Sequence, residues 1–245
     1  MPICGLRVSP GKYGDLIENA LTDLRENNVL DRIWSGDYGV WKSEPAGITD
    51  RLGWLDIARK MRENAGRLQR LALDVKSRGY TDILLLGMGG SSLAPGVLRA
   101  AFGVCDGYPD LTVLDSTDPG TILYQADRLN PVKTLFIVSS KSGTTTETLS
   151  FLKYFYNWIS DRLTAGVAGD HFIAITDPGS SLAELADRYS FRDTYINAPD
   201  IGGRFSALSY FGLVPAALMG ANIKQILDSS LEMEKQCREN DLSME

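Results

Sequence analysis

The densest group of chemically active side chains lies in residues 139–148, whose sequence is SSKSGTTTET. Serine and threonine hydroxyls and the ammonium of Lys141 stand here at the expected start of a helix. Hydroxyl donors, free N–H groups and the positive end of a helix together suit a phosphate group. Part of the run could serve only to cap the helix, because Thr144 and Glu147 have the spacing of a capping box. One cap needs one hydroxyl, so the surplus of hydroxyls beside Gly143 favours a phosphate site.

A second candidate is the glycine-rich segment 87–92, with the sequence GMGGSS. Gly89 and Gly90 would let backbone N–H groups approach a ligand closely, and the helix start after them would add positive potential. The segment could also be a plain tight turn in which Ser91 or Ser92 caps the next helix. It departs from the dinucleotide fingerprint G-x-G-x-x-G, because Ser92 stands where the third glycine belongs.

The third candidate is the segment 197–206, with the sequence NAPDIGGRFS. Its paired glycines permit unusual backbone angles directly before Arg204. An arginine presented by such a turn at a strand end can stabilise an oxyanion. Taken alone, the segment would favour a surface turn with a solvated arginine, so its meaning depends on the other two loops.

The pattern of apolar runs predicts a scaffold that brings these loops together. Short strands that are apolar on both faces alternate with helical segments, which indicates parallel βαβ units. The predicted strands are 83–86, 111–114, 135–138, 172–175 and 194–196. The predicted helices are 92–102, 119–127, 145–163, 182–189 and 207–219. We expect a doubly wound α/β fold, a three-layer αβα sandwich with a mainly parallel five-stranded sheet, which binds ligands at the carboxyl ends of its strands.

The residues before the first strand are expected to be helical. A long helix is predicted over 50–76, and a last amphipathic helix over 222–245. We therefore predict two parts in the chain. Residues 1–79 would form an N-terminal helical extension packed on the core, and residues 80–245 an α/β domain that ends in the last helix.

Composition narrows the function further. The chain has 245 residues, of which 44% are hydrophobic, enough for a sizeable core. Its net charge of −6 argues against nucleic-acid or membrane-surface partners. The single histidine, His171, argues against zinc, and no metal or cofactor is expected. Three cysteines without CxxC spacing predict free thiols. With no signal peptide and no membrane-spanning apolar run visible, we expect a cytoplasmic protein.

The three loops together resemble the first sugar-isomerase (SIS) domain of the phosphoglucose isomerase family. Residues 87–91 match the family's Gly-x-Gly-Gly-Ser turn, and 140–148 match its Ser-Lys-x-x-Thr-Thr-x-Glu-Thr loop. Residues 200–206 match its Asp-x-x-Gly-Gly-Arg-aromatic-Ser signature, with one residue fewer before the glycines. The resemblance covers about residues 81–220. The segment 31–34 and the region of Trp41 further resemble the isomerase part of fused transaldolase/phosphoglucose isomerases.

The resemblance implies a role for each loop in interconverting glucose 6-phosphate and fructose 6-phosphate. Arg204 would be catalytic and stabilise the enediolate that forms as a proton moves between C2 and C1. The hydroxyl-rich loop, residues 139–148, would hold the phosphate, and the glycine turn, residues 87–92, would line the sugar. The implied substrate-binding residues are Gly89, Gly90, Ser91, Ser140, Lys141, Ser142, Thr144, Thr145 and Glu147.

The resemblance also implies that part of the site lies outside these loops. In the family, the carboxylate base, the ring-opening histidine and a further lysine come from a second SIS domain and the C-terminal region, and the histidine belongs to the partner subunit of a dimer. No second glycine-rich βαβ series follows Gly220. We therefore expect a phosphate-binding half of the isomerase, inactive or very weak alone and completed by a second SIS domain or a homodimer partner.

Two other functions stay open. A non-catalytic SIS module that binds phosphosugars and acts through a partner would need no base. A dinucleotide-dependent oxidoreductase is suggested by the fold and by Asp115 at the end of the second strand, but the broken glycine fingerprint argues against it.

Overall fold

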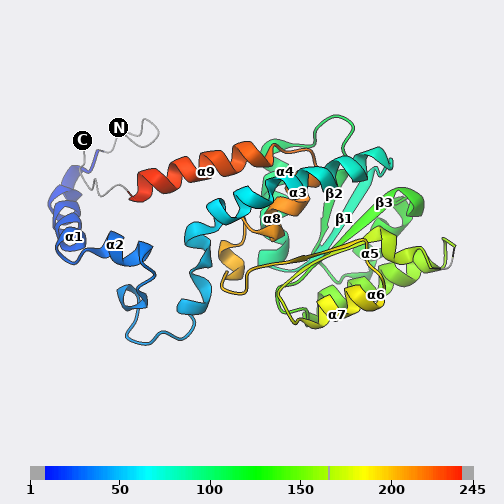
Figure 1. Cartoon of the computed structure of the whole chain (residues 1–245), viewed down its shortest axis with the longest axis horizontal. Coiled ribbons are helices and arrows are strands. Elements are labelled where there is room, and N and C mark those ends of the chain that lie inside the picture. The colour runs from blue at the N-terminus through cyan, green and yellow to red at the C-terminus, as the bar shows by residue number, and fades with distance from the viewer. Residues whose placement is uncertain (1–8, 165, 239–245) are drawn as a thin grey trace.

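A five-stranded parallel sheet forms the centre of the protein. The computed structural model describes residues 9–164 and 166–238 (Figure 1). Its strands are β1 (Asp82–Gly87), β2 (Asp110–Leu114), β3 (Thr134–Ser139), β4 (Phe172–Thr176) and β5 (Asp193–Ile196). They are ordered β2-β1-β3-β4-β5, and all neighbours run parallel. The five predicted strands and the doubly wound α/β fold are confirmed.

Helices cover both faces of the sheet, so the predicted three layers are present (Figure 1). One face carries α3 (Ile57–Ser77), α4 (Gly90–Phe102), α8 (Tyr210–Leu218) and α9 (Ile223–Arg238). The other face carries α5 (Pro119–Arg128), α6 (Thr146–Ser160) and α7 (Ser181–Arg188). Helices α4 to α8 each begin and end within three residues of the predicted limits.

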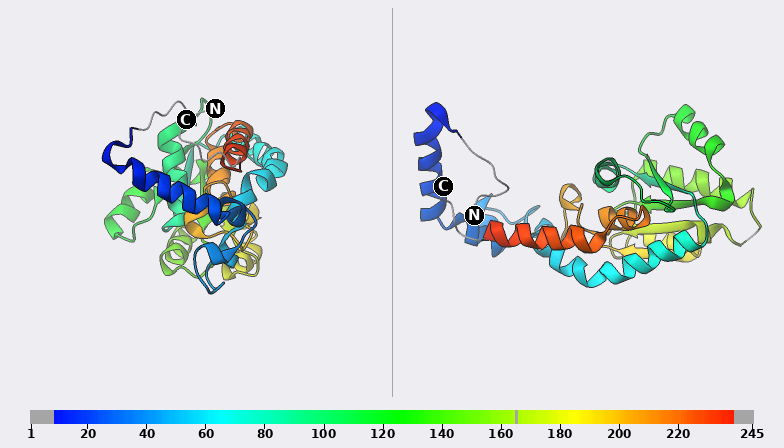
Figure 2. Two further views of the ribbon diagram at one scale, coloured as in Figure 1. Left: turned by 90° about the vertical axis from the view of Figure 1, so that its left-hand side faces the viewer. Right: turned by 90° about the horizontal axis from the view of Figure 1, so that it is seen from above.

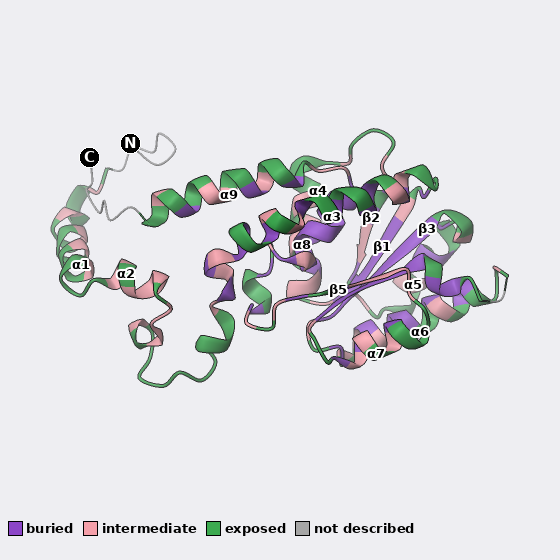
Figure 3. Cartoon of the chain, in the orientation of Figure 1, coloured by how far each residue is buried: buried purple, intermediate pink, exposed green. Residues whose placement is uncertain are grey.

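Alternating strand residues divide the interior into two hydrophobic cores. Ile83 and Leu85 of β1 face the α3 and α8 side, whereas Leu84 and Leu86 face the α6 and α7 side. All four side chains are fully buried, as expected for a strand covered on both faces. Figure 3 shows most of β1 in the colour of buried residues. This double burial explains why the strands could be recognised as unbroken apolar runs.

The N-terminal part divides into a packed helix and a projecting arm. Within the predicted extension 1–79, α3 packs against the strands and buries Leu68 and Val75 completely. In contrast, α1 (Gly14–Glu26) and α2 (Val29–Trp34) bury no residue and lie far from the sheet, beside the end of α9 (Figure 2). The Trp34 indole donates to the Cys237 carbonyl oxygen at 3.2 Å and stacks under the Arg238 guanidinium.

The long helix predicted over 50–76 is shorter than expected. Residues 49–56 form two 3₁₀ turns, and α3 begins only at Ile57. The reason is tertiary: Leu52 forms an antiparallel bridge with Ile201, and the Gly53 N–H donates to the Asp200 carbonyl oxygen at 2.9 Å. These contacts replace helical hydrogen bonds. The helix predicted over 222–245 is seen to Arg238, and its last seven positions lie outside the described residues.

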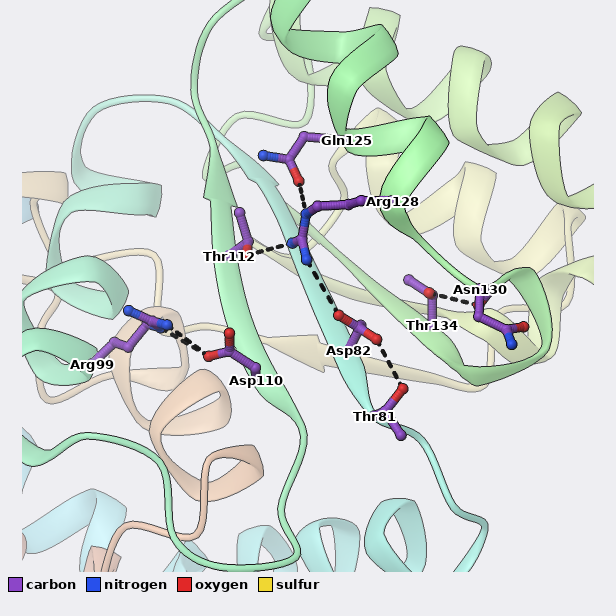
Figure 4. Close-up of polar contacts among 9 residues, drawn as sticks. All are labelled: Thr81, Asp82, Arg99, Asp110, Thr112, Gln125, Arg128, Asn130 and Thr134. Atoms are coloured by element: carbon purple, nitrogen blue, oxygen red, sulfur yellow. Dashed lines mark hydrogen bonds and ion pairs between the residues drawn. The ribbon is translucent and has the colours of Figure 1, made fainter.

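At the amino edge of the sheet, charged side chains are paired with one another (Figure 4). The Arg128 guanidinium lies 3.4 Å from the Asp82 carboxylate and donates to Gln125 and to Thr112, each at 2.6 Å. Arg99 of α4 pairs with Asp110, the first residue of β2, at 2.8 Å. These contacts join the starts of β1 and β2 to the helices on both faces.

Two remaining sequence predictions concern thiols and membranes. Cys105 and Cys237 have free thiols, and Cys4 lies outside the described residues. Across residues 9–164 and 166–238, no helix is both long and apolar enough to cross a membrane.

Candidate functional site

The strand order creates a switch point between β1 and β3. The chain leaves β1 for β2 on one side and then crosses to β3 on the other. Gly87, the last residue of β1, is paired in register with Ser139, the last residue of β3. The glycine turn and the hydroxyl-rich loop therefore begin side by side at the carboxyl edge, where doubly wound folds bind ligands.

The hydroxyl-rich loop forms a tight, internally bonded turn. The Ser140 and Thr145 hydroxyls lie 3.1 Å apart, and the Gly143 N–H donates to the Ser140 hydroxyl at 3.2 Å. Gly143 has φ 70, and a Cβ there would lie 2.7 Å from the backbone nitrogen of Leu182. The Ser181 hydroxyl donates to the Gly143 carbonyl oxygen at 2.6 Å. The loop is thus fastened to the start of α7.

The hydroxyls of this loop do not cap the helix that follows. Helix α6 begins at Thr146, and no side-chain hydrogen bond comes from its N-cap, Thr145. Thr144 lies one residue before this N-cap, and its hydroxyl donates to the Ser142 hydroxyl at 3.0 Å. The alternative in which Thr144 and Glu147 form a capping box is therefore wrong. The first N–H groups of a helix have no partner within it and carry its positive end. That end is left open beside a group of hydroxyls.

The glycine turn starts α4 without a serine cap. Gly89, with φ 55, is the N-cap residue, and Gly90 is already helical. The alternative in which Ser91 or Ser92 caps the helix is therefore wrong. Both serines lie in the first turn, and the Ser91 carbonyl oxygen accepts a hydrogen bond from the Ser139 hydroxyl at 2.9 Å. This bond ties the glycine turn to the end of β3.

The arginine loop, residues 197–206, packs against the glycine turn. A Cβ on Gly90 would lie 2.7 Å from the carbonyl carbon of Gly203, so only glycine allows this contact. The Ser206 hydroxyl donates to the carbonyl oxygens of Gly90 and Gly203, at 3.3 and 2.8 Å. Arg204 is exposed, and among the described residues it forms no ion pair. All three predicted loops therefore meet at one place.

Residues 52–54, which precede the sheet in the chain, pack against the arginine loop. Besides the Leu52–Ile201 bridge, the rings of Trp54 and Phe205 are stacked with centroids 5.4 Å apart. This segment was not predicted to take part in the site. The only local signal for a contact was Trp54 beside Gly53 in a segment predicted to be helical. Nothing in the sequence indicates that this segment packs against residues 201–205.

Lys141 points toward two other loops. Its ammonium donates to the Asp177 carboxylate, just after β4, and to the Pro199 carbonyl oxygen, after β5, at 2.9 Å in the second case. Burial raises the pKa of the Asp177 carboxyl, while the Lys141 ammonium acts in the opposite direction. Neither Asp177 nor Pro199 was predicted to belong to the site, although Asp177 directly follows a strand.

Two further residues with possible chemistry lie apart from these loops. His171 precedes β4 at the amino edge, is buried, and its Nδ1 lies 2.8 Å from the Thr134 carbonyl oxygen. This agrees with the structural role expected for it. Asp115 follows β2 and is exposed.

Comparisons with known proteins point to the same family as the motifs in the three loops. The family model for phosphoglucose isomerase matches residues 56–244. The glucose-6-phosphate isomerase of Carboxydothermus hydrogenoformans is 32% identical over 200 residues, covering 77% of this chain and 42% of the relative. An enzyme of the same name from Thermus thermophilus is 35% identical over 191 residues, covering 76% of this chain and 43% of the relative. The chain thus spans less than half the length of these two relatives.

Solved structures share the fold. The crystal structure of a hypothetical protein from Thermus thermophilus has a TM-score of 0.79 at 30% identity, covering 93% of this chain and 53% of the other. A glucose-6-phosphate isomerase from Chlamydia trachomatis has a TM-score of 0.72 at 20% identity, covering 92% and 47%, which is a likeness of fold. Since the family match runs through all three loops, this chain belongs to the phosphoglucose isomerase family.

Proposed function

We propose that this chain supplies the phosphate-binding half of a glucose-6-phosphate isomerase. The observation that carries the proposal is the meeting of three loops at the switch point of the sheet: the glycine turn, the hydroxyl-rich loop and the arginine loop. Membership of the isomerase family supports the choice of a sugar phosphate as substrate.

The phosphate is proposed to bind at the start of α6. Hydroxyls of Ser140, Ser142, Thr144 and Thr145 gather there beside the unpaired N–H groups of the helix start. Glu147, in the first turn, offers its half-buried carboxylate to a sugar hydroxyl. Gly89, Gly90 and Ser91 would line the sugar, because the glycine turn is tied to the hydroxyl-rich loop by the Ser139 hydroxyl.

Arg204 is proposed to stabilise the charge that develops during isomerisation. Removing the proton at C2 of the aldose leaves an enediolate with its negative charge on O1. Returning a proton to C1, while the hydroxyl proton passes from O2 to O1, gives the ketose, so the negative charge on oxygen is transient. A guanidinium without a carboxylate partner among the described residues has no competing anion and can donate hydrogen bonds to that oxyanion. The proton-moving base and the ring-opening acid would come from a second SIS domain or a homodimer partner.

Calorimetric titration of the full chain tests the phosphosugar site. We expect glucose 6-phosphate and 6-phosphogluconate to bind at least about tenfold more tightly than inorganic phosphate, because the sugar adds contacts with the glycine turn. Equal affinities for the sugar phosphates and inorganic phosphate would contradict a sugar site. Binding without turnover even when a second SIS domain is supplied would favour a phosphosugar-sensing module.

Arg204→Ala tests the catalytic assignment. In any preparation that shows turnover, loss of this oxyanion partner should lower kcat by about a hundredfold or more, while the Kd of 6-phosphogluconate changes less than about threefold. Arg70→Ala, an exposed arginine on α3, is the matched control and should leave both constants unchanged. Full activity of Arg204→Ala would remove Arg204 from the mechanism.

Free sugar phosphates occur in the cytoplasm, and we place the chain there. The free thiols of Cys105 and Cys237 support a reducing compartment.

A further inference from the structure

We infer that the Lys141 ammonium positions the hydroxyl-rich loop and does not bind the phosphate itself. On this view Lys141 is a tether that joins the loop after β3 to the loops after β4 and β5. The inference rests on the proposed function only for its effect on ligand binding, since the tether is a feature of the free protein. It differs from the role that the family resemblance implied for this side chain.

Two of the three N–H groups of the ammonium already have acceptors. The Lys141 Nζ donates to the Asp177 Oδ2 and, at 2.9 Å, to the Pro199 carbonyl oxygen. Both acceptors lie in loops that follow other strands. In contrast, the hydroxyls of Ser140 and Thr145 are bonded to each other within the loop, without the ammonium.

The backbone of Lys141 is held by the same neighbour. The Asp177 N–H donates to the Lys141 carbonyl oxygen at 3.2 Å, and the Thr176 hydroxyl lies 3.4 Å from that oxygen. Main chain and side chain of Lys141 are therefore both fixed to the end of β4. A residue held at both places sets the path of the loop that follows it.

Moving the ammonium to a bound phosphate would leave Asp177 without its partner. The Asp177 side chain is only 15% exposed, and its Oδ1 is already buried without a hydrogen-bond partner among the described residues. Leaving a mostly buried carboxylate without its cationic partner raises the free energy of the protein. The phosphate has other donors, since the helix start and the hydroxyls lie in the same loop, so it does not require this ammonium.

Asp177→Asn separates the two possible roles by the sign of its effect. If Lys141 binds the phosphate directly, removing a competing carboxylate frees the ammonium and tightens binding. If Lys141 is a tether, the same change loosens the loop and weakens binding. Lys141→Met alone cannot distinguish the roles, because it weakens binding in both cases.

The test is a titration of the full chain with 6-phosphogluconate for the wild type, Lys141→Met, Asp177→Asn and the double variant. We expect each single variant to weaken binding about tenfold and the double variant to bind no more weakly than either, because both changes cut the same tether. Lys153→Met, an exposed lysine on α6, is the control and should bind like the wild type. Tighter binding by Asp177→Asn, or additive losses in the double variant, would overturn the inference.

Hydrogen–deuterium exchange without ligand gives a second readout. Cutting the tether should speed exchange of the amides in 140–146 and 198–203 at least about threefold, with little change in β1. Unchanged exchange in both single variants would overturn the tether. If no variant and no wild-type protein binds a sugar phosphate, the proposed function fails, and faster exchange would still establish the tether.

Discussion

The two edges of the central sheet differ in whether their charged side chains have partners within the chain. At the amino edge, Arg128 and Arg99 are paired with Asp82 and Asp110 (Figure 4). At the carboxyl edge, the exposed Arg204 forms no ion pair among the described residues, and α6 begins without a side-chain hydrogen bond from its N-cap residue. Polar groups satisfied inside the chain stabilise it, whereas donors left open favour an anionic ligand. This contrast supports the proposed site at the carboxyl edge without reference to any relative.

The carboxyl edge relies on close backbone packing where the amino edge relies on ion pairs. Gly143 and Gly90 sit where a side chain would strike backbone atoms of Leu182 and Gly203. Lys141 with Asp177 is the exception, an ion pair placed among the loops. Three changes test how far this division holds, beginning with the largest expected effect.

Gly143→Ala should lower the free energy of unfolding by about 3 kcal/mol, because it adds a Cβ at positive φ against the backbone of Leu182. Urea unfolding measures the loss, and phosphosugar binding should weaken with it. Gly96→Ala in α4 is the control, since a Cβ there meets nothing within 4 Å. Equal stability of the two variants would show that the loop is not packed as tightly as described.

Arg128→Met should lower the free energy of unfolding by about 2 kcal/mol, because it removes three hydrogen bonds at the amino edge. The Kd for 6-phosphogluconate should stay unchanged, since the proposed site is at the other edge. Arg70→Met, on the exposed side of α3, should affect neither quantity. A changed Kd in Arg128→Met would mean that the two edges are coupled.

The smallest effect concerns Asp74, whose pKa is held below its ordinary value of 3.8 mainly by the hydrogen bond from Arg192. Since the folded pKa is the lower one, the carboxylate stabilises the fold above about pH 4 and loses this effect as the pH falls through the folded pKa. Asp74→Asn should therefore cost less than about 1 kcal/mol at pH 7, because Asp74 is half-exposed, and less still at pH 3.

Urea unfolding of wild type and Asp74→Asn at both pH values measures this difference, with Asp187→Asn on α7 as the control. A difference that grows on acidification would contradict the assigned sign.

The five strands and their parallel direction could be predicted from the sequence, because strands buried on both faces appear as unbroken apolar runs, such as residues 83–86. The strand order β2-β1-β3-β4-β5 was not predicted. Once the strands are parallel, their carboxyl ends must share an edge, which placed the three loops together. Local rules failed where distant partners act. Residues 49–56 form 3₁₀ turns and not an α-helix because Ile201 and Asp200, far along the chain, hold Leu52 and Gly53. Thr144 fails to cap for a local reason, because α6 begins one residue later, with Thr145 as its N-cap residue.

The partners of Lys141 illustrate the same limit. Its contacts with Asp177 and Pro199 join loops after three different strands, and no spacing rule connects them. The binding roles of the loop residues, the division at residue 79 and the likeness to fused transaldolase/phosphoglucose isomerases stay predictions.

The bridge between Leu52 and Ile201 has a consequence for the order of folding. One partner is synthesised before β1 and the other after β5, so the bridge closes a loop that contains the whole sheet. Such long-range closures are costly in chain entropy and form late, after local contacts have shortened the distance. The loop that carries Arg204 is therefore expected to reach its final position last. A chain caught partway would already have its five strands but not yet its guanidinium in place.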